Sequence, residues 1–138
     1  MSFSKPVFYR RGGTAGWEIR DWETANKLLS YLGPKVSDFA VFENPDHSYV
    51  QCAGAKRRLT VEARVYSPSG SFTHFVFGRG EPKNETEFIE CSEGAIEVDA
   101  NQVLQLRHAR QIMRQFLEDG SFPPDFVATD VTERFKNT

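Results

Sequence analysis

The sequence predicts an α+β fold: a mainly antiparallel sheet of about five to seven strands, packed with two principal helices at about residues 22–32 and 101–118. Two observations favour this fold. Three runs rich in Val, Tyr, Thr and Phe follow one another between residues 48 and 80, separated by short turn-forming clusters, as in an antiparallel meander. Helical patterns flank the strand runs instead of alternating with them. The 138 residues fit a single domain, 1–138.

The first part of the chain is expected to form two short strands, at residues 6–10 and 17–20, and then a helix. Asp21 should begin this helix, because its carboxylate can accept from the free N–H groups of the first turn. Gly33 and Pro34 should end it. The apolar face recurs at helical spacing and consists of Trp22, Ala25, Leu28, Leu29 and Leu32. A strand at 38–43 then leads into the meander.

The meander strand at residues 58–66 alternates between a polar and an apolar face. Glu62 and Arg64 lie on the polar face, and the residues expected in the core are Leu59, Val61, Ala63 and Val65. The next strand, at 71–77, is apolar on both faces and is expected to be central in the sheet. The loop at 67–70 decides where His74 lies. With two or four loop residues His74 falls on the apolar face, and with three it falls beside Glu62 and Arg64.

A polar constellation of Gln51, Glu62, Arg64 and His74 would form in the three-residue case. A carboxylate can orient a histidine as a general base, so these residues are a candidate enzymatic or small-ligand site. The alternative is a Glu–Arg ladder on a solvated face, with the histidine satisfied in the core.

Two more strands, at 87–91 and 95–98, should precede the second helix. Asp99 is expected to cap that helix, with Gln102 as its capping-box partner, and Gly120 should end it. His108 and a basic stripe fall on its polar side; the stripe, which is interpreted as a solvated face, consists of Arg107, Arg110 and Arg114. The tail should cross the domain as a strand or a turn of helix, held by Phe126, Val127, Val131 and Phe135.

Composition and spacing argue against several classes of protein. The net charge of −2 disfavours direct nucleic-acid binding. Two cysteines, Cys52 and Cys91, make no disulfide framework, and the three histidines lack metal-ligand spacing. The glycine-rich loop at 11–16 lacks a P-loop ending, so we expect neither a metal nor another cofactor. We see no signal peptide or membrane-spanning run, and therefore expect a cytoplasmic protein without membrane contact.

An acidic segment runs from Glu81 to Asp99, with seven acidic residues and one lysine. In a strand pair, alternate residues line one face. A common negative surface toward a basic protein could therefore be formed by Glu85, Glu87, Glu93, Glu97 and Asp99. The alternative is a solvated sheet edge that charge protects from aggregation. The candidate partner-binding residues are Glu85, Glu87, Glu90, Glu93, Glu97 and Asp99.

Several short motifs carry a family resemblance. They are SYVQCAG at 48–54, LTVEAR at 59–64, HF at 74–75 with Gly78, and an amphipathic helix ending in FLxxGxxP at 116–123. Over about Ser48 to Phe126 the chain resembles immunity proteins of bacterial polymorphic-toxin systems, in particular the family often paired with nucleic-acid deaminase toxins. These motifs are structural and not catalytic.

The resemblance implies a cytoplasmic bacterial protein that is not an enzyme. It would bind a cognate secreted toxin domain, such as one acting on nucleic acid, and neutralise it by blocking its active site. Two alternatives stay open: a small-ligand or enzymatic domain that uses Glu62, Arg64 and His74, and a homodimer formed through a sheet edge.

Overall fold

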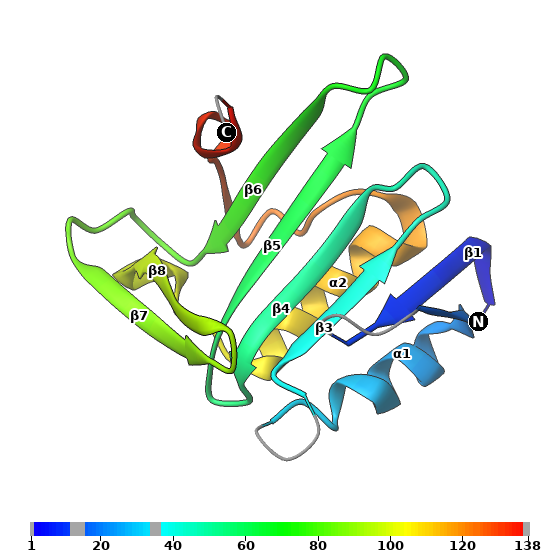
Figure 1. Ribbon diagram of the computed structural model, residues 1–138, viewed down its shortest axis with the longest axis horizontal. Coiled ribbons are helices and arrows are strands. Elements are labelled where there is room, and N and C mark those ends of the chain that lie inside the picture. Colours follow the sequence, from blue (N-terminus) through cyan, green and yellow to red (C-terminus); the bar gives the residue numbers. More distant parts are fainter. Residues whose placement is uncertain (1, 12–15, 34–36, 137–138) are drawn as a thin grey trace.

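The computed structural model describes residues 2–11, 16–33 and 37–136, and it has the predicted α+β fold. Seven antiparallel strands form the main sheet in the order β2-β1-β3-β4-β5-β6-β9 (Figure 1). Their bounds are β1 Ser2–Arg10, β2 Trp17–Asp21, β3 Phe39–Glu43, β4 Tyr49–Ala55, β5 Arg58–Tyr66, β6 Phe72–Gly78 and β9 Val127–Asp130. Two further strands, β7 Thr86–Cys91 and β8 Gly94–Asp99, pair as a separate hairpin. Each strand predicted from the sequence is present.

Helices α1 (Trp22–Leu29) and α2 (Leu106–Asp119) share one core with the main sheet. In Figure 1, α2 passes behind β3 and β4, and the β7–β8 hairpin lies at the ends of β4 and β5. The predicted alternation of β5 is confirmed, because Leu59, Val61 and Ala63 are buried in the core. The apolar stripe of α2 that belongs to this core consists of Leu106, Ala109, Ile112, Met113, Phe116 and Leu117. The other face of β5 therefore presents Glu62 and Arg64.

The first helix begins as predicted but ends three residues earlier than expected, at Leu29 instead of 32. Asp21 caps its start, where the Asp21 carboxylate accepts from the N–H of Thr24 at 2.8 Å. At the other end, the Ser30 hydroxyl donates to the Lys27 carbonyl, and the following N–H groups bond three residues back. Hydrogen bonds to the third residue back form a tighter, 3-10-type turn, so the α-helix ends here. Pro34 and residues 12–15 of the glycine-rich loop lie outside the described residues.

The second helix begins at Leu106, so the prediction of a helix from about 101 was wrong. Asp99 and Gln102 do form a capping box, but around a short 3-10 helix, η1 (Ala100–Gln102). The chain then becomes extended, because Leu104 forms two backbone hydrogen bonds with Leu59 of β5, at 2.8 and 2.9 Å. The N–H and C=O of Leu104 are therefore hydrogen-bonded to the sheet and are not free to form the bonds of a continuous helix.

Strand β6 is second from the edge of the sheet, not central as expected, because β9 pairs with its outer side. Both faces of β6 are nevertheless covered, which accounts for the apolar residues on each of them. Phe77 lies in the helix-covered core, and on the other face the 3-10 helix η2 (Thr132–Phe135) brings the ring of Phe135 to 4.4 Å from that of His74. Two apolar faces reflect cover on both sides, which a strand beside an edge can also have.

Both cysteines are expected to be unreactive in the folded protein. Burial raises the pKa of Cys52 to about 12, and burial with the nearby carboxylates of Asp38, Glu90 and Glu93 raises the pKa of Cys91 to about 11. Since the thiolate is the nucleophile, neither thiol should react at neutral pH at the rate of free cysteine. Labelling with a disulfide reagent should be slow in buffer and complete in guanidinium chloride. Rapid labelling of Cys52 in buffer would contradict this burial.

Candidate functional site

The loop between β5 and β6 places His74 beside Glu62 and Arg64. The N–H of Ser67 donates to the Ser71 carbonyl at 2.8 Å, which leaves three loop residues, 68–70. Gly70 supplies the positive φ, 90°, that this loop requires. Arg64 then pairs directly with His74. Of the register alternatives drawn from the sequence, the structure has the one that brings the polar constellation together.

His74 connects Glu62 and Arg64 through its two ring nitrogens. Nε2 lies 2.6 Å from Glu62 Oε1, and Arg64 Nε donates to Nδ1 at 3.1 Å. Because Nδ1 accepts a hydrogen bond, it carries no proton, and the ring proton lies on Nε2 and is donated to Glu62. Gln51 shares the same face, opposite Glu62 in the β4–β5 register, so all four predicted residues lie on one side of the sheet.

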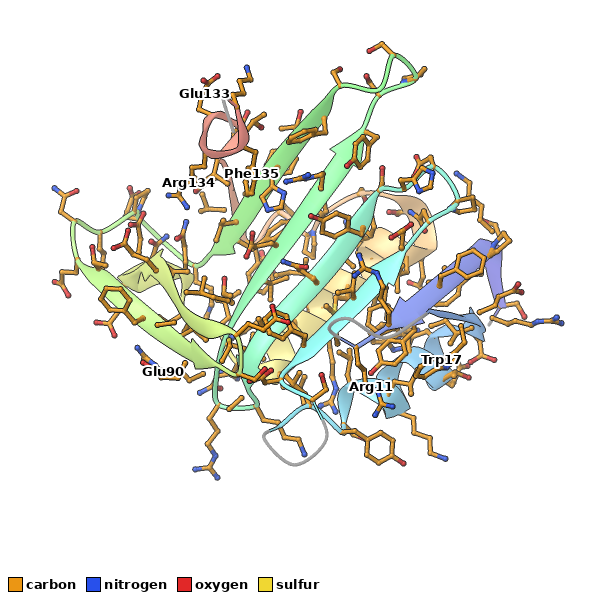
Figure 2. The ribbon with its side chains drawn as sticks, in the orientation of Figure 1. Arg11, Trp17, Glu90, Glu133, Arg134 and Phe135 are labelled. Carbon is orange, nitrogen blue, oxygen red and sulfur yellow. The ribbon has the colours of Figure 1, made fainter. Side chains whose placement is uncertain are left out.

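This network lies beneath the C-terminal segment. His74 is only 1% exposed, and its backbone N–H donates to the Thr132 hydroxyl at 2.9 Å. The Arg64 guanidinium lies over two rings, 4.0 Å from the centroid of Phe72 and 4.6 Å from that of Phe135. Figure 2 shows η2 beside β6, with Phe135 directed toward the face of β5 and β6. The network thereby fastens η2 to the sheet.

The chemistry open to His74 follows from these contacts. A general base needs a free lone pair within reach of a substrate proton. The Nδ1 lone pair of His74 is taken by Arg64, and Nε2 is occupied by Glu62. Since the ring is also covered, the arrangement suits a cross-link between strands and C-terminal segment better than proton transfer.

The acidic candidates do not form the single face that was expected, because the hairpin register divides them. Phe88 pairs with Glu97, and Glu90 with Ala95, so these residues share the outer face with Asp99. Glu87 lies on the opposite face, beside the buried Ile89, and its carboxylate accepts from Arg58 at 2.7 Å. The prediction that Glu87 joins Glu97 and Asp99 on one surface was therefore wrong. The apolar residues Ile89 and Val98 decide which face turns inward.

The two remaining acidic candidates flank the hairpin strands. Glu85 is exposed and immediately precedes β7, and its carbonyl accepts from the N–H of Ala100 at 2.8 Å. Glu93 is exposed in the turn between the two strands. The neighbouring Ser92 donates its hydroxyl to Asp38 at 2.8 Å, which ties this turn to the start of β3.

Phe88 is a candidate residue that the sequence analysis missed. Its side chain is 51% exposed, in the middle of the outer face of the hairpin, directly opposite Glu97. Figure 2 shows Glu90 at the outer margin of the same hairpin. The sequence could have predicted the exposure of Phe88, because strict alternation in β7 places it on the face of Thr86 and Glu90, opposite to Ile89. We call Phe88, Glu90, Glu97 and Asp99 the acidic hairpin face.

No protein-family model matches the chain, and no curated protein does either. In the described ranges, no three His, Cys, Asp or Glu side chains are placed to hold a metal ion. No helix in the described part of the chain is long and apolar enough to cross a membrane.

Proposed function

We propose that this protein is a cytoplasmic immunity-type protein, which binds a cognate toxin domain through the acidic hairpin face and blocks the toxin's active site. The observation that carries the proposal is the exposed ring of Phe88 within a rim of carboxylates. Aromatic residues are enriched at the centres of protein interfaces, and the rim around such a centre is polar.

The charge of the hairpin indicates the kind of partner. The segment from Glu81 to Asp99 carries seven acidic residues and one lysine, whereas the whole chain has a net charge of only −2. Such a concentration of negative charge attracts a basic surface and speeds the encounter with it. Enzymes that act on nucleic acid have basic surfaces, because they bind the phosphate backbone. A toxin of that class would suit this face, in agreement with the family resemblance.

The hairpin is also held firmly enough to present a defined surface. Arg58 of β5 donates to the Glu87 carboxylate and, at 3.1 Å, to the Phe88 carbonyl. Together with the Ser92–Asp38 contact, these bonds fix both ends of the hairpin to the main sheet. A surface that is ordered before binding loses less conformational entropy on association.

The test uses the polypeptide encoded next to this gene. We expect its C-terminal domain, made inactive for purification, to form a tight 1:1 complex, and co-expression to protect cells from the active domain. The double variant Glu90→Lys/Glu97→Lys should weaken binding by about 100-fold, through lost attraction and new repulsion. Phe88→Ala should weaken it by about 10- to 100-fold. Calorimetry measures both effects.

The matched control is Glu18→Lys/Glu118→Lys, which changes the net charge equally on β2 and α2. Its affinity should stay within about threefold of wild type, because long-range attraction between exposed charges is largely screened by salt. Equal losses in both double variants would show that net charge matters and the hairpin face does not. Unaltered binding by Phe88→Ala and by the hairpin variant would rule out this face as the interface. Light scattering on the protein alone tests the homodimer alternative.

A further inference from the structure

A pocket of about 250 Å³ lies where the end of β6 meets the first turns of α2 and the turn before β9. Its lining residues are Arg79, Arg107, His108, Gln111, Asp125 and Phe126. None of them belongs to the acidic hairpin face or to the Glu62–Arg64–His74 network. A second cavity of about 430 Å³ shares three of these residues and continues along α2.

His108 supplies a fixed hydrogen-bond donor to the pocket wall. The prediction that it lies on the polar side of the helix was wrong, since it is only 7% exposed. Its Nδ1 accepts from the backbone N–H of Gln105 at 3.0 Å, so the ring proton lies on Nε2. Among the described residues, none accepts a hydrogen bond from that nitrogen. Burial, with Arg79 and Arg107 nearby, lowers the pKa of His108, so the ring is a neutral donor at neutral pH.

The pocket also contains two guanidinium groups, those of Arg79 and Arg107. In the described part of the chain, neither Arg79 nor Arg107 forms an ion pair, although Asp125 lines the same pocket. The backbone of Arg79 is held by its N–H, which donates to the Asn101 carbonyl at 2.8 Å. Guanidinium groups present planar pairs of N–H donors that match oxyanions. The pocket thus offers an excess of positive charge and of donors.

The carboxylate of Asp125 limits which anions the pocket can bind. A carboxylate beside two arginines repels a fully ionised oxyanion, but it can accept a hydrogen bond from one that keeps a proton. Phosphate monoesters have a second pKa near 6 and inorganic phosphate has a somewhat higher one, so both carry a proton part of the time at neutral pH, whereas sulfate carries none. We propose that this pocket binds a phosphate group, of inorganic phosphate or of a small phosphate monoester. The adjoining cavity would then hold the rest of the ester.

The first experiment measures affinity for the anions by calorimetry on the full chain, at constant ionic strength. We expect saturable binding of inorganic phosphate, and binding of sulfate that is weaker by about tenfold or more. Ribose 5-phosphate distinguishes a phosphate monoester from inorganic phosphate as the ligand. Tighter binding of this ester than of inorganic phosphate indicates a ligand that extends into the adjoining cavity. The His108 ring signals in NMR should shift with phosphate. Equal affinity for phosphate and sulfate, or no saturable binding, would overturn the proposal.

The second experiment uses variants. Arg79→Gln/Arg107→Gln should weaken phosphate binding by about tenfold or more, while Arg20→Gln/Arg57→Gln, with the same loss of charge elsewhere, should not. Asp125→Asn should remove most of the preference for phosphate over sulfate. Because Asp125 is exposed, this variant should fold like the wild type. An unchanged preference in this variant would refute the role of Asp125. The site does not depend on the proposed toxin partner, so either proposal can fail alone.

Discussion

Replacing Glu62 with alanine is expected to lower the free energy of unfolding by about 3 kcal/mol. The Glu62 carboxylate accepts from Nε2 of His74 at 2.6 Å, and His74 is buried. Without Glu62, that N–H has no acceptor, and the Arg64 guanidinium loses the nearby negative charge. Urea denaturation measures the loss. The amide of Val131, which donates to the His74 carbonyl at 2.8 Å, should also exchange hydrogen faster, because η2 is held through His74.

Two variants separate this effect from a general effect of charge. Glu62→Gln keeps an oxygen that can accept from His74, so it should cost only about 1 kcal/mol. Glu97→Ala removes an exposed carboxylate from the acidic hairpin face and should change stability by less than about 0.5 kcal/mol. If Glu62→Ala were as stable as Glu97→Ala, the network would not support the fold. That result would favour the alternative in which Glu62, Arg64 and His74 serve an enzymatic or ligand-binding role.

Replacing Gly54 with alanine is expected to cost about 3 kcal/mol or more, since it combines backbone strain with a collision. Gly54 has φ of 127°, which residues with a side chain rarely adopt. A Cβ there would lie 2.6 Å from the Arg58 carbonyl oxygen and 2.8 Å from Cγ2 of Ile89. Relief would require shifting the β5 backbone at Arg58 and Leu59 as well as the β7–β8 hairpin that carries Ile89. Chemical denaturation gives the magnitude, and binding to the toxin partner should weaken as well.

Gly94→Ala is the matched control for this prediction. Gly94 also has a positive φ, 115°, but apart from its two chain neighbours no described residue has a heavy atom within 4 Å of its would-be Cβ. Its replacement should therefore cost only the conformational penalty, about 1 kcal/mol. The difference between the two variants measures how closely β5 and the hairpin approach Gly54. Equal losses would mean that both yield freely to a Cβ at Gly54.

Local patterns were sufficient to predict most elements of the fold. Alternation in β5 placed Leu59 in the core and Glu62 outside it, and the spacing in α2 identified its buried stripe. These predictions succeed because side-chain direction follows from backbone geometry over a few residues. The ends of the helices were predicted less well. The start of α2 depends on the pairing of Leu104 with Leu59, a contact between segments far apart in the sequence.

The candidate sites depended even more on distant contacts. The sequence left the register of His74 open, and the hairpin bonds around Ser67 decided it. Glu87 and Glu97 lie on different strands, so the hairpin register was needed to separate them, and the burial of Ile89 against the sheet decided which face turns inward. The pocket at His108 had no signal in the sequence, because Arg79, Arg107 and Asp125 come from three separate segments.

The sequence by itself determined the fold class, the strands, the burial of β5 and the acidity of the 81–99 segment, because composition and periodicity are local properties. Only the tertiary structure decided that Glu62, Arg64 and His74 form a closed network under η2. It also decided that Phe88 lies exposed among carboxylates, and that two arginines that form no ion pair with the described residues meet a buried histidine. The physical reason is the same each time: such groups are brought together by packing between segments, and packing depends on the whole chain.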